Sequence, residues 1–162
     1  MASHMLLPLL IASALAVGFF VLALYRPNPA RIIAGGGFIL AGLIDAILAL
    51  IDPRIFVNSL APNALPLYQT FFFGLQGGAL GRFILAIGLW QLVVAGLILV
   101  NRTDFTRLGL VAAALFLAGI SPLGVGCAFP SNLILAGALI ALLRLQWPLE
   151  SAVPAQKARA KM

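Results

Sequence analysis

The chain has 162 residues, of which 63% are hydrophobic and only 9% are charged. Soluble domains carry roughly 25% charged residues because their surfaces face water, so these values exclude a water-soluble fold. The formal charge of +6 is spread singly between apolar runs, which excludes a nucleic-acid-binding face. One cysteine and one histidine provide neither an internal disulfide nor a metal site of known spacing.

Five apolar runs are long enough to approach or reach the length that a helix needs to cross roughly 30 Å of hydrocarbon. We therefore predict an all-α membrane protein, an up-and-down bundle with a four-helix core and an extra N-terminal helix. The residues before the first run, 1–5, are interpreted as a cloning remnant. The predicted spans, within a single domain at 6–148, are residues 6–25, 31–51, 78–100, 105–121 and 132–147.

The first run is the one that a signal peptide could also explain. Its apolar length exceeds the 7–15 residues of a signal-peptide core, and it ends in Tyr25-Arg26 rather than a small-residue cleavage site. We interpret it as a retained helix that stops where Pro27 and Pro29 are expected to prevent helix from continuing.

The segment at 52–77 is predicted to be a loop on the outer side, and it is the least regular part of the chain. Its later half, Leu67 to Gly74, is too apolar for a solvated loop. A short helix along the interface, an extension of the third span and a re-entrant segment all remain open.

The basic residues predict the orientation, because short loops rich in Lys and Arg stay in the cytoplasm. With five spans, only Arg54 and Arg82 fall on one side, and the other eight basic residues fall on the opposite side. We therefore expect a multi-pass protein of the inner (plasma) membrane with its N-terminus outside, ending in a basic cytoplasmic tail at 149–162.

Asp45 is the leading functional candidate, because it is the only acidic residue within a predicted span. An unpaired carboxylate inside a bilayer costs several kcal/mol, so it should face the bundle interior. Two interpretations remain open. Asp45 binds a proton or a ligand in an outward-facing cavity, or it fastens two helices as an ion pair.

Arg82 is the expected partner of Asp45, since it enters the third span from the same side; snorkelling toward lipid headgroups is its alternative. Gln91 lies nine residues further, which places it on the opposite side of a straight helix. It could bind a ligand or hydrogen-bond across a helix interface. Tyr68 and Gln76, in the outer segment, complete the ligand-site candidates.

Four glycines are predicted to allow close helix packing. Gly77 and Gly81 form a small-xxx-small pair, Gly88 follows seven residues later, and Gly42 lies on the face of Asp45.

Short patterns from Arg31 onward resemble those of the DoxX-like group of small helical membrane proteins. They include Arg31-Ile32-Ile33-Ala34-Gly35, Leu40-Ala41-Gly42-Leu43, Asp52-Pro53 and Leu85-Ala86-Ile87-Gly88. The resemblance covers residues 31–147. It implies a compact four-helix bundle and a link to quinone-coupled redox reactions, often as an accessory subunit.

No catalytic constellation is recognised in the sequence, so an enzyme is the least supported class. We predict an integral membrane binding or accessory protein with a polar site around Asp45 and Arg82, in a quinone-linked complex. The alternative is a small oligomeric transporter or channel that uses Asp45 as a titratable group. A quinone or a lipid is the expected ligand type, and the bilayer and a homo-oligomer or larger complex are the expected partners.

Overall fold

The computed structural model describes residues 3–60, 64–75, 78–100, 102–123 and 129–145. These residues form seven α-helices and one short 3-10 helix, η2, and contain no strand. The helices are α1 (Ser3–Tyr25), α2 (Pro27–Ile51), α3 (Pro53–Leu60), α4 (Pro66–Gly74), α5 (Gly78–Leu99), α6 (Thr103–Ile120), η2 (Ser121–Leu123) and α7 (Ser131–Leu145). The tail at 149–162 and the candidates Gln76 and Gly77 lie outside the described residues.

Prolines open three of the helices: α2 begins at Pro27, α3 at Pro53 and α4 at Pro66. The first amides of a helix have no partner within it, so a proline there loses no hydrogen bond and its fixed φ suits the helix. We expected the second span to begin at Arg31, after Pro29, but both prolines lie in the first turn of α2. The proline signal marked the end of α1 correctly and missed the start of α2.

Within the residues that the structure describes, four helices are long and apolar enough to cross a membrane: α1, α2, α5 and α6 with its η2 extension. The helix expected as the fifth span, α7, has 15 residues and so rises only about 22 Å. The chain is therefore a helical membrane protein with four spans that meet the length criterion, and a fifth span at α7 stays a prediction.

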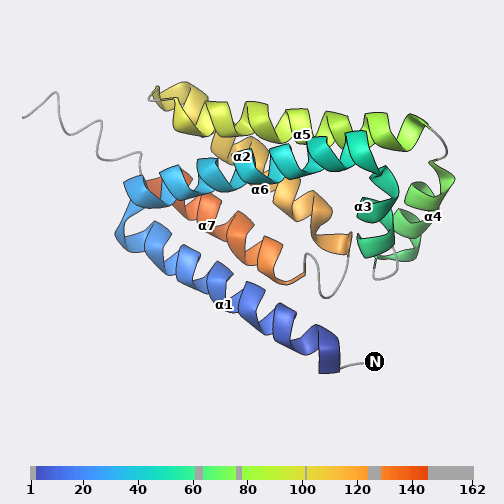
Figure 1. Ribbon diagram of the computed structural model, residues 1–162. Helices are drawn as coiled ribbons and strands as arrows, with labels where there is room; N and C mark the ends of the chain where they lie inside the picture. The colour runs from blue at the N-terminus through green and yellow to red at the C-terminus, as the bar shows by residue number, and fades with distance from the viewer. Residues whose placement is uncertain (1–2, 61–63, 76–77, 101, 124–128, 146–162) are drawn as a thin grey trace, which may run out of the picture.

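The five long helices run back and forth (Figure 1). The helices α1, α5 and α7 point one way, while α2 and α6 point the other way. The short helices α3 and α4 gather at the end of the bundle where α2 stops and α5 begins. Leu75 is extended and separates α4 from α5, so the apolar segment after Pro66 is a helix of its own rather than a continuation of the third span.

The most extensive helix pairing is between α2 and α5, which are antiparallel. A Cβ atom added at Gly42 would lie 2.8 Å from the carbonyl oxygen of Gly88, and one added at Gly88 would lie 2.8 Å from the carbonyl oxygen of Gly42. Near one end, a Cβ at Gly81 would lie 3.2 Å from the Ala49 carbonyl oxygen. Glycine at these positions brings the two backbones into contact.

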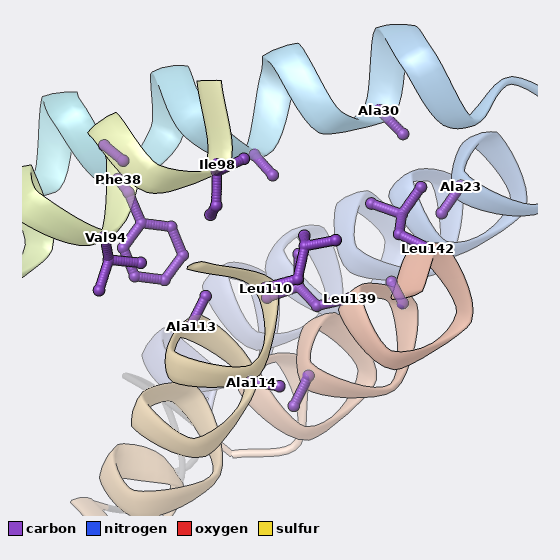
Figure 2. Close-up of a cluster of buried hydrophobic side chains, with 14 residues drawn as sticks. Ala23, Ala30, Phe38, Val94, Ile98, Leu110, Ala113, Ala114, Leu139 and Leu142 are labelled. Atoms are coloured by element: carbon purple, nitrogen blue, oxygen red, sulfur yellow. The ribbon is translucent and has the colours of Figure 1, made fainter. Parts of the chain in front are cut away.

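A first hydrophobic cluster fills the centre of the bundle and joins all five long helices (Figure 2). Alanines provide close contact, and a few larger side chains fill the space between them. Its labelled members are Ala23, Ala30, Phe38, Val94, Ile98, Leu110, Ala113, Ala114, Leu139 and Leu142.

A second hydrophobic cluster lies at the end of the bundle that carries α3 and α4. Its buried members are Val57, Ala64, Phe72, Leu80, Ile84 and Leu123.

The outer surface of the bundle is also apolar, as at Leu50, which is 77% exposed, and Leu15, which is 69% exposed. A face of this kind is suited to lipid chains rather than to water.

Candidate functional site

A hydrogen bond between two spans joins Asp45 on α2 to Gln91 on α5. The Gln91 amide nitrogen, Nε2, donates to Oδ2 of Asp45 at 3.0 Å. Gln91 is buried and Asp45 is half-buried. The amide thereby satisfies one lone pair of a carboxylate that has been removed from water.

The antiparallel arrangement explains why these two side chains meet. In each helix the polar residue follows the contact glycine by three positions, Gly42 before Asp45 and Gly88 before Gln91. A helical side chain leans toward the N-terminus of its own helix. In antiparallel neighbours these two leans converge, so the carboxylate and the amide approach each other beside the glycine contact.

Asp45 and Gln91 line a cavity of about 210 Å³ at the α3–α4 end of the bundle. The cavity lies between the spans and the two short helices, and most of its wall is aromatic or aliphatic. The other lining residues are Phe56, Tyr68, Phe71, Phe72, Phe83, Ile87, Phe116, Ile120, Leu123 and Asn132.

The aromatic wall is a set of rings that contact one another. The Phe71 and Phe83 rings have centroids 5.2 Å apart, and the Phe71 and Phe72 rings have centroids 5.6 Å apart, both edge-to-face. Phe56 packs on Phe72 at 6.1 Å. Aromatic pairs prefer edge-to-face geometry, so contacts between the rings help to keep each ring of the wall in its orientation.

One residue that lines this cavity has an acceptor without a partner: the carbonyl oxygen Oε1 of Gln91 is buried and accepts no hydrogen bond. Gln91 is only 5% exposed. The carboxylate of Asp45 can only accept when ionised, so the amide nitrogen must face it and the oxygen must face elsewhere. A buried acceptor left unpaired costs about 1–3 kcal/mol. The cavity lining therefore includes a residue whose buried acceptor is unsatisfied.

Tyr68 lines the cavity from α4, and its hydroxyl donates to the carbonyl oxygen of Gly119 near the end of α6 at 2.7 Å. The backbone amide of Leu65 donates to the carbonyl oxygen of Pro122 at 3.1 Å. These two bonds tie the start of α4 to the α6–η2 corner and hold the aromatic wall over the cavity.

Arg82 does not belong to this site. Its side chain is exposed, and it is absent from the residues that line the cavity. Half a helical turn separates its direction from that of Gln91, as the nine-residue spacing predicts. We expected Arg82 to be the partner of Asp45, but the hydrogen bond that the structure gives Asp45 comes from Gln91.

Sequence reasoning missed most of the cavity wall. The run Phe71-Phe72-Phe73 was noticed only as unusually apolar, yet the first two rings line the cavity and Phe73 is exposed. Phe83, Phe116 and Asn132 carried no signal, because each lies in an ordinary apolar stretch and gains its role from the packing of distant segments.

Across the part of the chain that the structure describes, no group of three His, Cys, Asp or Glu residues is placed to hold a metal ion. No family model, no curated protein and no solved structure matches this chain.

Proposed function

We propose that this protein is an integral membrane binding protein whose ligand occupies the aromatic cavity beside Asp45 and Gln91. The observation that carries the proposal is the buried, unpartnered Oε1 of Gln91, a residue that lines a cavity whose wall is mostly rings and aliphatic chains. Ligand pockets are typically apolar, with a few polar groups that fix orientation. The site proposed from the sequence, around Asp45 and Arg82, is thereby moved to Asp45 and Gln91.

A matched pair of tryptophan substitutions tests this function. Ile87→Trp would fill the cavity that Ile87 lines, whereas Ile47→Trp on α2 would add the same bulk to a side chain that is 54% exposed. We expect native mass spectrometry of protein released from membranes to show a bound small molecule in the wild type and in Ile47→Trp, and none in Ile87→Trp. Equal occupancy in all three would contradict the proposal.

The particular role that the DoxX-like resemblance suggests is an accessory subunit of a quinone-linked redox complex. A flat quinone ring suits the aromatic wall, but its carbonyl groups are acceptors, and one of the two hydrogens on Gln91 Nε2 is already donated to Asp45. This role therefore predicts that a larger complex co-purifies with the chain, and that any quinone extracted with it is lost in Ile87→Trp.

A second candidate function is transport, by a homo-oligomer, and its support is the carboxylate of Asp45 inside a span and at the cavity wall. Carboxylates in such positions mark ion and proton pathways in many transporters. Flux of protons or of a cavity ligand into proteoliposomes, abolished by Asp45→Asn and preserved in Asp104→Asn, would support this function over simple binding.

We place the protein in the inner (plasma) membrane, with the cavity end outside and the α1–α2 and α5–α6 turns in the cytoplasm. The support is the distribution of basic residues: Arg26, Arg31, Arg102 and Arg107 flank those two turns, and basic residues concentrate in cytoplasmic loops.

A further inference from the structure

The polar end of the cavity offers acceptors from both members of the Asp45–Gln91 pair. Oε1 of Gln91, a residue that lines the cavity, is buried and has no hydrogen-bond partner, and an ionised carboxylate has no hydrogen to donate. A molecule that only accepts hydrogen bonds would leave Oε1 unsatisfied. The ligand must therefore bring at least one N–H or O–H donor to this end.

The cavity also has a charge that its own lining does not balance. Among the described residues that line the cavity, Asp45 is the only one that carries a formal charge, and none is a lysine, an arginine or a histidine. Burying a carboxylate without a counter-charge is costly, and one amide hydrogen bond offsets only part of that cost. A cation beside Asp45 would offset the remaining cost of burying the carboxylate.

The aromatic wall favours a cation as well. Ring faces attract an ammonium group held within about 6 Å of the centroid, most strongly where water is excluded. Phe71, Phe72 and Phe83 form a connected set that lines the same cavity as Asp45. The cavity of about 210 Å³ exceeds the roughly 150 Å³ at which an apolar cavity holds benzene, which leaves room for a ring and a short amine-bearing chain.

We propose that the cavity binds a small organic cation, a protonated amine whose N–H groups donate to the Asp45 carboxylate and to Oε1 of Gln91, and whose apolar body lies among the phenylalanine rings. This inference rests on the proposed function, that the cavity is a binding site, and adds the chemical class of its ligand. The amine supplies in one group the donors and the positive charge that the site lacks.

Three fluorinated probes of similar shape separate the contributions. They are 4-fluorophenethylammonium, which has charge and donors, its N-trimethyl derivative, which has charge without donors, and 2-(4-fluorophenyl)ethanol, which has a donor without charge. Binding is followed by 19F NMR titration of the protein in nanodiscs, with empty nanodiscs as the reference for partitioning into lipid. We expect the primary ammonium to bind about tenfold or more tightly than either other probe, since hydrogen bonds to charged groups are stronger than those between neutral groups, and a tenfold difference corresponds to about 1.4 kcal/mol.

Asp45→Asn removes the charge and keeps an oxygen that can still accept from Gln91. We expect it to weaken binding of the primary ammonium about tenfold and to leave the alcohol nearly unchanged. Asp104→Asn is the control, because Asp104 is an exposed carboxylate in the first turn of α6, away from the cavity lining. It should bind all three probes as the wild type does.

The outcomes separate the two levels of inference. If all three probes bind equally well and Ile87→Trp abolishes binding, the cavity is a binding site and the amine proposal is wrong. If no probe binds above the empty-nanodisc reference, the amine proposal is also wrong, and native mass spectrometry of Ile87→Trp still decides the proposed function. If Asp45→Asn does not fold, the ranking of the three probes on the wild type remains a sufficient test.

Discussion

Gly42 and Gly88 set the distance between α2 and α5, because each backbone carbonyl occupies the space that a side chain on the other helix would need. The same contact determines where Asp45 and Gln91 meet, three residues further along each helix. Because glycine has only a hydrogen atom where other residues have a side chain, the two helices come close enough for Asp45 and Gln91 to form their hydrogen bond. A mutation that separates the helices at Gly42 and Gly88 should therefore also weaken the hydrogen bond between Asp45 and Gln91.

Gly42→Ala should destabilise the protein, because the new Cβ would lie 2.8 Å from the Gly88 carbonyl oxygen and the helices must separate. Overpacking of this kind costs about 1–3 kcal/mol. Gly37→Ala on the same helix is the control, since nothing lies within 4 Å of its added Cβ. Unfolding in mixed detergent micelles measures both, and a Gly42→Ala protein as stable as Gly37→Ala would contradict the contact.

A double-mutant cycle between Asp45→Ala and Gln91→Ala should show a coupling free energy of about 0.6–1.7 kcal/mol, the range for hydrogen bonds between membrane helices. The corresponding cycle between Asp45→Ala and Arg82→Ala should show almost none, because the Arg82 side chain is exposed and lies off the cavity. Strong coupling to Arg82 would instead restore the pair that the sequence suggested.

At the scale of elements, the cavity depends on two short helices that cover the end of the bundle. The helix α4 is fastened at its start by Leu65 and Tyr68, whose hydrogen bonds reach Pro122 and Gly119. Its following turn places Phe72 in the second hydrophobic cluster. The elements that enclose the cavity are thus held by few contacts compared with the α2–α5 pair.

Tyr68→Phe keeps the ring and removes the hydroxyl that donates to Gly119, so it should cost about 0.5–1.5 kcal/mol. We expect the loss to be local, with faster hydrogen–deuterium exchange in residues 66–74 and unchanged exchange in α2 and α5. Thr70→Val is a control, because the Thr70 hydroxyl bonds only within α4, to Pro66. Faster exchange spread evenly over the whole bundle would contradict this role.

Sequence reasoning located helix ends well where they depend on local residues such as proline. It failed where a feature depends on how distant segments pack. It placed the end of α2 at Ile51, before Asp52-Pro53, because a proline ends the preceding helix, but it could not tell a proline that ends one helix from one that opens the next. The spacing of Arg82 and Gln91 predicted opposite faces. Which face points inward depends on partners 46 residues away, and no local pattern contains that information.

At the scale of the whole molecule, the long helices alternate in direction and run between two ends that have different chemistry (Figure 1). One end holds the α1–α2 and α5–α6 turns, which Arg26, Arg31, Arg102 and Arg107 flank, and the other holds α3, α4 and the aromatic cavity. The apolar flanks between them face outward over the length of α1 and α2. A bilayer around these flanks would leave the two ends on opposite sides of the membrane.

Single-cysteine labelling tests this orientation in a Cys127→Ser background. We expect a membrane-impermeant maleimide to label Asn58→Cys on α3 in intact cells, because Asn58 is exposed at the cavity end. Arg102→Cys, between α5 and α6, should be labelled only after the cells are opened. The reverse pattern would invert the topology, and labelling of both positions in intact cells would exclude the even alternation across one membrane.

The glycine contact between α2 and α5 also has a mechanical meaning, since it lies partway along both helices. Side chains that interlock resist tilting, but two bare backbones touching at Gly42 and Gly88 can act as a fulcrum. The arm from Gly42 to Ile51 is nine residues, or about 14 Å, so a tilt of about 10° would move that end by about 2 Å. The opposite arm of α2 carries Ala30, Ala34 and Phe38 of the first hydrophobic cluster, so a tilt that widens or narrows the aromatic cavity would also shift the packing at the centre of the bundle.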